Sequence, residues 1–460
     1  MASTPTELPS TTSTFPTQQK PIPYSCENGR RTPLSSILPP LVFGTATFNH
    51  QYNSDPFALD TTGLVTSALT HGIRAFDTSP YYGPSEILLG NALASPFVRE
   101  TFPRNSYMIL TKAGRISSDE FDYSAHWIRQ SVARSLERLH TDYLDLVYCH
   151  DVEFVSAGEV LEAVRELRRL RDEGKVRYVG ICGYPIDVLG DMAEMLLRET
   201  GEPIDCVQSY ANFNLQNQTL AGHRGIQRLR DAGVEVVPNA SPLGMGLLRR
   251  QGVPVGALGD FHPSSRELRA AVREASDFCD RHGEKLEVIA LRFALETWIS
   301  VGASCGSKGD PASGLPWQLE SNDDVGGSKL GVSVIGVSNP AELEKTMLVW
   351  RSIIDGLEGG EKTAQQAGRW NRAWEWSRNR QKAVQMLAGA VQDILGQWFD
   401  YAWASPDAGF VNKRKVDAKV VVVDDDGEGS WLTPAASPEQ SPVVSASAEY
   451  IEKEKGIPLR

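Results

Sequence analysis

Eight short apolar runs, rich in β-branched residues, recur along the middle of this 460-residue chain. Between successive runs lie longer segments that contain the 3.6-residue apolar period of helices. Continuously apolar runs are typical of strands buried on both faces of a parallel sheet, so eight of them alternating with helices predict a (β/α)8 TIM barrel. A doubly wound open sheet is the alternative, but no Gly-x-Gly-x-x-Gly turn follows an early strand. The runs span residues 41–46, 73–78, 107–112, 144–150, 176–182, 206–213, 234–240 and 332–337.

Segments of different composition flank the predicted barrel. Residues 1–37 are rich in Ser, Thr and Pro, and we expect a disordered leader there and a disordered tail over 412–460. The barrel is expected over 38–355, with a polar, Gly- and Ser-rich flexible insertion at 304–331. Residues 356–411 contain five of the ten tryptophans, and we expect a C-terminal extension of helices that pack on the barrel.

Charge and composition exclude several kinds of partner. The chain has 46 basic and 58 acidic residues, a net charge of −12 and a pI near 5.3, so it would repel nucleic acid. No run approaches about 18 consecutive apolar residues, so no membrane partner is expected. The N-terminus lacks the basic start and apolar run of a secretory signal, and the six scattered cysteines suit a reducing compartment. We expect a cytoplasmic protein that is a monomer or a weak homodimer.

Polar residues stand at the carboxyl ends of three predicted strands. Asp77 is in the second run, Lys112 ends the third and His150 ends the fourth, and Tyr81 and Tyr82 follow Asp77 closely. Each alone could be structural, as a turn residue, a surface lysine or a core histidine. Side chains at these strand ends would meet at one end of a barrel, where a buried lysine and a buried aspartate need each other.

Such a group of side chains can move a proton to or from a carbonyl or carbinol oxygen. The ordinary pKa of tyrosine is near 10, and a neighbouring lysine ammonium is expected to lower it. An aspartate would hold that lysine, and a histidine could hydrogen-bond the substrate oxygen. The chemistry requires a hydride partner, because the sequence offers no redox-active group and no cluster of metal ligands. No metal is predicted.

Six motifs, in order along residues 40–355, resemble those of the aldo-keto reductase superfamily. They are found at residues 72–90, 111–114, 143–151, 174–184, 207–214 and 240–248. The resemblance implies a catalytic tetrad of Asp77, Tyr82, Lys112 and His150. Tyr82 is assigned in place of Tyr81 because the family spacing puts the catalytic tyrosine five residues after the aspartate.

The resemblance also implies a nicotinamide cofactor lying extended across the barrel mouth. Its implied contacts are Cys182, Gly183, Gln208, Ser241, Leu243, Gly244, Gly336, Val337, Ser338 and Glu342. Two positions depart from the usual pattern, since Cys182-Gly183 replaces a Ser-Asn pair and Ala240 replaces a tyrosine that stacks on the nicotinamide. Gly336 and Glu342 stand where NADPH-preferring relatives offer Lys and Arg. We therefore expect NAD in preference to NADP.

The stretches 181–185 and 239–243 resemble those of the superfamily branch that oxidises aldoses with NAD. The implied substrate is a small aldose, a D-arabinose-like pyranose, oxidised at C1 to the aldonolactone with Tyr82 as proton acceptor. An NADPH-dependent reductase of aldehydes or ketones and a nicotinamide-sensing, non-catalytic regulatory subunit remain as alternatives. A phosphate-binding isomerase on the same barrel is disfavoured, because no Glu base stands at a suitable strand end.

Overall fold

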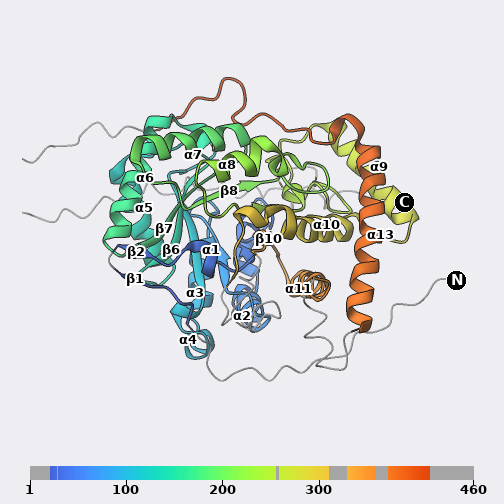
Figure 1. Ribbon diagram of the computed structural model, residues 1–460, viewed down its shortest axis with the longest axis horizontal. Coiled ribbons are helices and arrows are strands. Elements are labelled where there is room, and N and C mark those ends of the chain that lie inside the picture. The colour runs from blue at the N-terminus through green and yellow to red at the C-terminus, as the bar shows by residue number, and fades with distance from the viewer. Residues whose placement is uncertain (1–20, 28, 255–257, 310–328, 358–370, 415–460) are drawn as a thin grey trace, which may run out of the picture. The chain divides into compact units, whose positions relative to one another are not determined.

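A computed structural model of the protein describes residues 21–27, 29–254, 258–309, 329–357 and 371–414. Within these residues eight parallel strands form a closed barrel in which neighbours in sequence are neighbours in space (Figure 1). The last strand closes the barrel on the first, with Ser333 opposite Leu41 and Gly336 opposite Gly44. The predicted barrel is confirmed, and each apolar run coincides with one strand. The strands are β3 (Leu41–Gly44), β4 (Ala75–Asp77), β5 (Met108–Ala113), β6 (Leu144–His150), β7 (Val176–Gly183), β8 (Cys206–Tyr210), β9 (Asn239–Ala240) and β10 (Ser333–Gly336).

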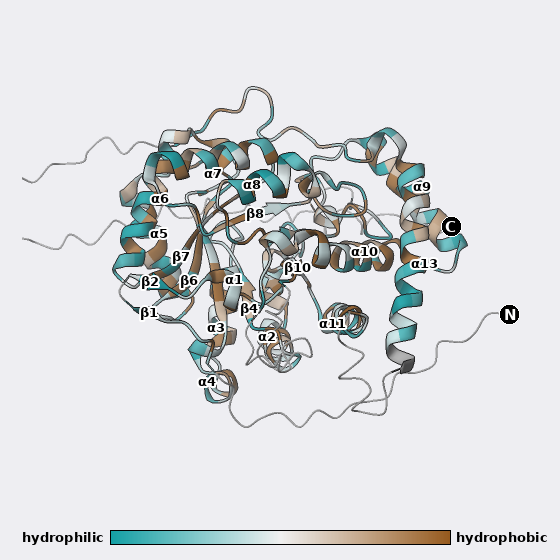
Figure 2. Cartoon of the chain, in the orientation of Figure 1, coloured by the Kyte–Doolittle hydropathy of each residue, from teal (hydrophilic) through white to brown (hydrophobic). Residues whose placement is uncertain are grey.

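Helices surround the barrel and bury their apolar faces against it. In α6 (Ala157–Asp172), Ser156 and Glu159 form a capping box at the start, and Val160, Val164 and Leu167 recur at helical spacing on the buried face. Figure 2 shows the strands β6 and β7 as apolar at the centre and outer turns of α7 and α8 as hydrophilic. The other helices around the strands are α2 (Thr61–Thr70), α3 (Ser85–Leu93), α4 (Pro96–Thr101), α5 (Ala125–Arg138), α7 (Ile186–Thr200), α8 (Arg228–Asp231), α10 (Leu286–Val301) and α11 (Pro340–Asp355).

Alternation along the strands decides which side chains fill the barrel. Successive residues of a strand point to opposite faces, so positions two apart share a face. Ala75, Leu110 and Tyr148 belong to the cluster that fills the interior. Room for the Tyr148 ring comes from Gly180 on β7, where a Cβ atom would lie only 2.5 Å from the ring. The next inward position along each of the strands β4, β5 and β6 is therefore the last one before the barrel mouth.

The N-terminal segment corrects the expected boundary at residue 37. Ile22, Leu34, Ile37 and Leu38 are buried in the same interior cluster, and Leu34–Ile37 form the short helix α1 just before β3. The carboxylate of Glu235 accepts hydrogen bonds from the N–H groups of Leu34 and Ser35 at 3.1 and 3.0 Å. The strands β1 (Cys26–Glu27) and β2 (Arg30–Arg31) form a hairpin before this helix. The composition of this segment did not predict its packing, because only a few of its residues are apolar and these few cover the barrel.

The C-terminal extension packs on one side of the barrel. The helix α13 (Asn371–Leu395) buries Val384, Ala388 and Val391 against α10 and α9 (Arg266–Arg281). By length and composition Leu286–Cys305, which contains α10, could cross a membrane, but α9, α11 and α13 pack on it and much of it is buried. This is the environment of a core helix.

The described chain continues past α13 to Arg414. We call Gly396–Arg414 the C-terminal strap. Asn412 exchanges hydrogen bonds of 2.9 Å with the backbone of Phe121, so the packed chain continues past the expected boundary at residue 411. Most of the expected insertion, residues 310–328, and the tail from 415 onward lie outside the described residues.

Candidate active site

Three charged or titratable side chains converge at the carboxyl ends of adjacent strands. Asp77 ends β4, Lys112 is the penultimate residue of β5 and His150 ends β6. Each stands two residues after an interior side chain and is itself buried. Tyr82 lies in the loop that follows β4, where its N–H donates to the carbonyl of Ser79 at 3.1 Å. The structure thus brings together all four side chains of the predicted tetrad.

Lys112 and Asp77 form a buried ion pair. The Lys112 Nζ lies 2.6 Å from Asp77 Oδ1 and also donates to the carbonyl of Thr78 at 2.9 Å. Burial opposes a charge on Lys112, but the Asp77 carboxylate outweighs it and raises the pKa of the lysine. Burial also raises the pKa of Asp77, while Lys112 draws it down. We assign both groups as charged, because the short contact satisfies a charge that neither could bear alone.

Tyr82 lies between the ion pair and His150. The Lys112 Nζ is 4.9 Å from the centroid of the Tyr82 ring. Burial raises the pKa of Tyr82 above its ordinary value, and it outweighs the lowering effect of Lys112, which Asp77 partly cancels. Lys112 does lower the pKa of Tyr82, as expected. The expectation that this pKa lies below its ordinary value is wrong, because burial destabilises the phenolate more than Lys112 stabilises it.

The neighbouring tyrosine is engaged elsewhere. The Tyr81 hydroxyl accepts a hydrogen bond from Arg115 Nη2 at 3.1 Å, and the Arg115 guanidinium stacks 3.8 Å from the Tyr81 ring centroid. The Tyr82 hydroxyl makes no hydrogen bond to any residue in the described parts of the chain. Of the two phenols, Tyr82 is therefore the one available to a substrate.

His150 is neutral and oriented by Ser79. Burial and the Lys112 and Arg115 cations hold the pKa of His150 well below its usual value. The Nδ1 atom lies 3.1 Å from Ser79 Oγ, which also accepts a hydrogen bond from the N–H of Tyr81. If the Ser79 hydroxyl donates to Nδ1, the proton of the ring is on Nε2. His150 then offers an N–H donor to a substrate oxygen.

Sequence reasoning missed three ionisable residues at the barrel mouth. Arg115 follows β5, and Asp151 and Glu153 follow β6. Arg115 forms an ion pair with Asp151, whose Oδ2 also lies 3.6 Å from His150 Nε2. Glu153 Oε1 accepts hydrogen bonds of 3.0 Å from the N–H of Tyr184 and the hydroxyl of Ser405. Because all three residues lie within three positions of the ends of β5 and β6, their place in the sequence could have predicted that they belong to the site.

Side chains of His150, Asp151 and Cys182 lie within 4.8 Å of one another and could in principle hold a cation. Asp151 is already paired with Arg115, however, and Lys112 contributes a second positive charge to the surroundings of His150. A metal ion would have to displace Arg115 and tolerate Lys112. The charges favour hydrogen bonding to a neutral, polar ligand at this place.

The C-terminal strap crosses the loops at the barrel mouth. Trp403 stacks on Tyr184 after β7, with ring centroids 4.7 Å apart and an interplanar angle of 5°. Phe410 packs against Phe154 after β6, with centroids 4.9 Å apart. Together with the contact of Ser405 to Glu153, these interactions hold the C-terminal strap against the loops that follow β6 and β7.

The residues expected to contact a cofactor lie around the same end of the barrel. Cys182 and Gly183 end β7, Gln208 is in β8, residues 241–244 follow β9, and residues 336–338 lead from β10 into α11. The Gln208 Oε1 atom is buried and has no hydrogen-bond partner among the described residues. An amide oxygen so placed fits the carboxamide of a nicotinamide, which can donate to it.

Glu342, in the first turn of α11, is less free than its place in the sequence suggests. Its Oε2 accepts a hydrogen bond from the N–H of Ser338 at 2.8 Å, and its N–H donates to Asn339 Oδ1 at 3.0 Å. Arg249 Nη2 donates to Glu342 Oε1 at 3.3 Å. Asn339 therefore caps α11, and the Glu342 carboxylate is held by the N–H of Ser338 and neutralises an arginine in the loop after β9.

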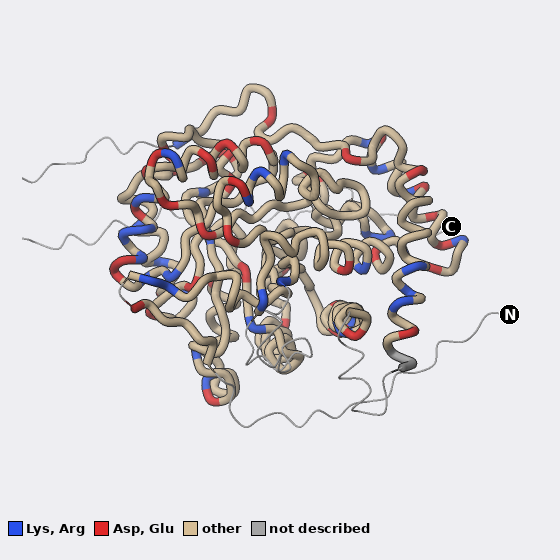
Figure 3. Tube along the Cα trace, viewed as in Figure 1, with Lys and Arg blue, Asp and Glu red and all other residues tan. Residues whose placement is uncertain are grey.

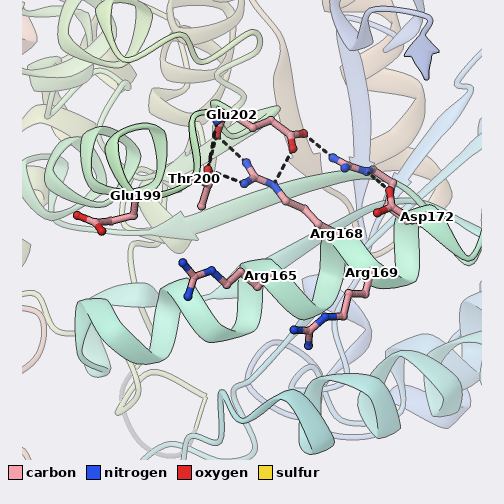
Figure 4. Close-up of a pocket in the computed structure, with 8 residues that line it drawn as sticks. Arg165, Arg168, Arg169, Asp172, Glu199, Thr200 and Glu202 are labelled. Carbon is pink, nitrogen blue, oxygen red and sulfur yellow. Dashed lines mark hydrogen bonds and ion pairs between the residues drawn. The ribbon is translucent and has the colours of Figure 1, made fainter. Parts of the chain in front are cut away.

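A separate hollow lies among the outer helices. It has a volume of about 430 Å³ and lies between Arg165, Arg168, Arg169, Thr200 and Glu202 (Figure 4). Charges of both signs mark these helices (Figure 3). Arg168 donates to the Thr200 hydroxyl and the Glu202 carbonyl, both at 2.7 Å. The hollow is near the C-terminal ends of α6 and α7, and so at the opposite end of the barrel from the tetrad.

The fold and the site define a class of protein. A closed (β/α)8 barrel carries a buried lysine–aspartate pair, a neutral histidine and an available phenol at its catalytic end, together with an amide suited to a nicotinamide. Residues 40–353 match the model of the Aldo/keto reductase family. The chain belongs to this family, and it is an oxidoreductase.

Three relatives of the chain are named as sugar dehydrogenases. The chain is 46% identical over 271 residues to D-arabinose 1-dehydrogenase of Saccharomyces cerevisiae, covering 58% of this chain and 78% of the relative. It is 39% identical over 239 residues to L-galactose dehydrogenase of Arabidopsis thaliana, covering 51% and 70%. It is 26% identical over 298 residues to D-threo-aldose 1-dehydrogenase of a Pseudomonas species, covering 56% and 82%.

Proposed function

We propose that this protein oxidises an aldose, a D-arabinose-like pyranose, at C1 to the aldonolactone with NAD. The observation that carries the proposal is the meeting of Tyr82, the Lys112–Asp77 pair and His150 at one point. Three relatives named for dehydrogenation of sugars support the substrate class. A charged and hydrogen-bonding mouth, with Arg115 and Asp151 beside the tetrad, also suits a polyhydroxylated substrate.

The proton of the anomeric hydroxyl passes to Tyr82. His150 donates a hydrogen bond from Nε2 to the same oxygen and orients it. Lys112 stabilises the tyrosinate that must form before proton transfer, and Asp77 holds Lys112 in place. When bound, NAD would supply the acceptor for the hydride that leaves C1. Gln208, through its unpartnered Oε1, and Cys182 at the end of β7 would hold the nicotinamide.

The preference for NAD over NADP is part of the proposal. Gly336 offers no cation, and the carboxylate of Glu342 offsets the charge of Arg249. A 2′-phosphate would therefore meet little net positive charge at the start of α11, whereas a ribose diol can hydrogen-bond to the carboxylate.

The decisive experiment follows NADH or NADPH formation with a panel of D-arabinose, L-galactose, L-fucose and L-xylose. We expect oxidation of at least one sugar, with higher kcat/KM for NAD+ than for NADP+. Efficient NADPH-dependent reduction of simple aldehydes, with no sugar oxidised, would favour the reductase alternative. Binding of nicotinamide without turnover in either direction would favour a regulatory subunit.

A further inference from the structure

Two charged side chains at the barrel mouth take no part in the proton transfer described above. Arg115 comes two residues after the end of β5, and Asp151 directly follows His150. Their side chains are only 15% and 3% exposed, and they form an ion pair. Buried charges are costly, so a pair held beside the reacting groups, and not on an outer helix, points to contact with a ligand.

Arg115 is fixed from three sides. It donates to Asp151 Oδ2, to the Tyr81 hydroxyl at 3.1 Å and to the carbonyl of Ser117 at 3.2 Å. Its stacking on the Tyr81 ring adds a fourth restraint. A guanidinium has five N–H donors, and three are used in these contacts. The arginine thus orients Asp151 and still has donors to offer.

Asp151 faces the reacting groups. Its backbone is left-handed, with φ of 60°, and its Oδ2 lies 3.6 Å from His150 Nε2. The other carboxylate oxygen, Oδ1, accepts no hydrogen bond from the residues that the structure describes. The Asp151 carboxylate therefore lies beside the His150 atom that would hold the reacting oxygen, and its Oδ1 can accept a hydrogen bond.

We propose that Asp151 binds the hydroxyl on C2 of the sugar and that Arg115 acts as its positioning residue. The inference rests on the proposed function, because it takes the oxygen at His150 Nε2 to be the anomeric one. Oxygens on adjacent sugar carbons lie about one hydrogen-bond length apart, so the C2 hydroxyl reaches Asp151. A hydroxyl both donates and accepts, which matches a carboxylate beside a guanidinium. The pair would select 2-hydroxy sugars over sugars that lack this group.

The test compares D-arabinose with 2-deoxy-D-ribose, which is D-arabinose without its C2 hydroxyl. We expect the wild-type protein to favour D-arabinose in kcat/KM by roughly tenfold to hundredfold, the effect of one hydrogen bond to a charged group. In Asp151→Asn this ratio should fall to a few-fold, with most of the loss in the KM for D-arabinose and little change for the 2-deoxy sugar. If the protein oxidises another aldose, that aldose is compared with its own 2-deoxy analogue instead.

Two further variants separate recognition from folding. Arg115→Lys keeps the positive charge but cannot hydrogen-bond Asp151 and Tyr81 at the same time, so the preference for D-arabinose should fall in this variant too. This variant tests the inference even if Asp151→Asn does not fold. Asp172→Asn, an exposed acid at the far end of α6, is the control and should keep the wild-type ratio. A wild-type protein that oxidises both sugars equally, or variants that slow both equally, would overturn the inference alone. A wild-type protein that oxidises no aldose would overturn the proposed function with it.

Discussion

The rings of Tyr82 and His150 meet edge to face, with centroids 5.7 Å apart and an interplanar angle of 87°. A phenol and an imidazole in this arrangement border the same space from two sides, one as proton acceptor and the other as hydrogen-bond donor. Lys112 approaches Tyr82 from a third side. Tyr81 makes a similar edge contact with His150, with centroids also 5.7 Å apart. Lys112 beside Tyr82 and Arg115 on the hydroxyl of Tyr81 are therefore what distinguish the two adjacent tyrosines.

Tyr82→Phe keeps the ring and its packing but removes the proton acceptor. We expect kcat for sugar oxidation to fall by at least about a hundredfold, the lower range for general acid–base catalysis. Binding of NADH, measured by fluorescence, should change little. Tyr81→Phe is the matched control and should be mild, and a reversal of the two results would reassign the catalytic tyrosine.

Glu342→Gln should weaken the discrimination against NADP+. The substitution keeps an acceptor near Ser338 but leaves the charge of Arg249 without its partner. Because the pair is partly exposed and screened, we expect the NAD+/NADP+ ratio of kcat/KM to fall by only about two- to fivefold. Glu344→Gln, an exposed change on the same helix, should leave the ratio as it is. An unchanged ratio in Glu342→Gln would place the adenosine end of the coenzyme elsewhere.

Glu153 makes stability depend on pH. Burial, and then the charge of Asp151, raise the pKa of Glu153 to about 8, whereas an unfolded glutamate has a pKa of about 4.3. The folded state thus keeps a proton that the unfolded state releases, so this group lowers the free energy of unfolding as pH rises from about 4.3 to 8. Each unit of pKa difference corresponds to about 1.4 kcal/mol.

Denaturant unfolding at about pH 6 and about pH 9 measures this effect. Wild-type protein should lose more stability between the two conditions than Glu153→Gln, which cannot titrate but keeps an acceptor for Ser405 and Tyr184. Equal losses in the two proteins would mean that Glu153 is ionised in the folded state at both pH values.

Leu34→Ala should destabilise the barrel. Leu34 is fully buried in the interior cluster, so its truncation leaves a cavity and should cost about 2–5 kcal/mol of unfolding free energy. Ser36→Ala, on the same short helix, is the control and should cost much less. The measurement is chemical denaturation. A negligible effect of Leu34→Ala would mean that this segment does not pack on the barrel and belongs to the disordered leader that composition suggests.

The barrel and the position of its reactive end could be predicted from the pattern of residues along the chain. Apolar runs of strand length, each followed by a helical segment, have one favourable arrangement in which every strand is covered on both sides. Parallel strands then carry their last residues to the same rim. Asp77, Lys112 and His150 could therefore be placed together from the sequence, and the resemblance to the aldo-keto reductases pointed to Tyr82.

The surroundings of these groups could be seen only in the folded protein. Ser405 meets Glu153 across 252 positions of the chain, and Arg249 meets Glu342 across 93. Burial raises the pKa of Tyr82, against the expectation for a tyrosine beside a lysine, and two groups that also act on it, Lys112 and Cys182, lie on β5 and β7. The physical reason is that strand alternation and helical period are local properties, whereas contacts between loops, and the exclusion of water they cause, depend on the path of the whole chain.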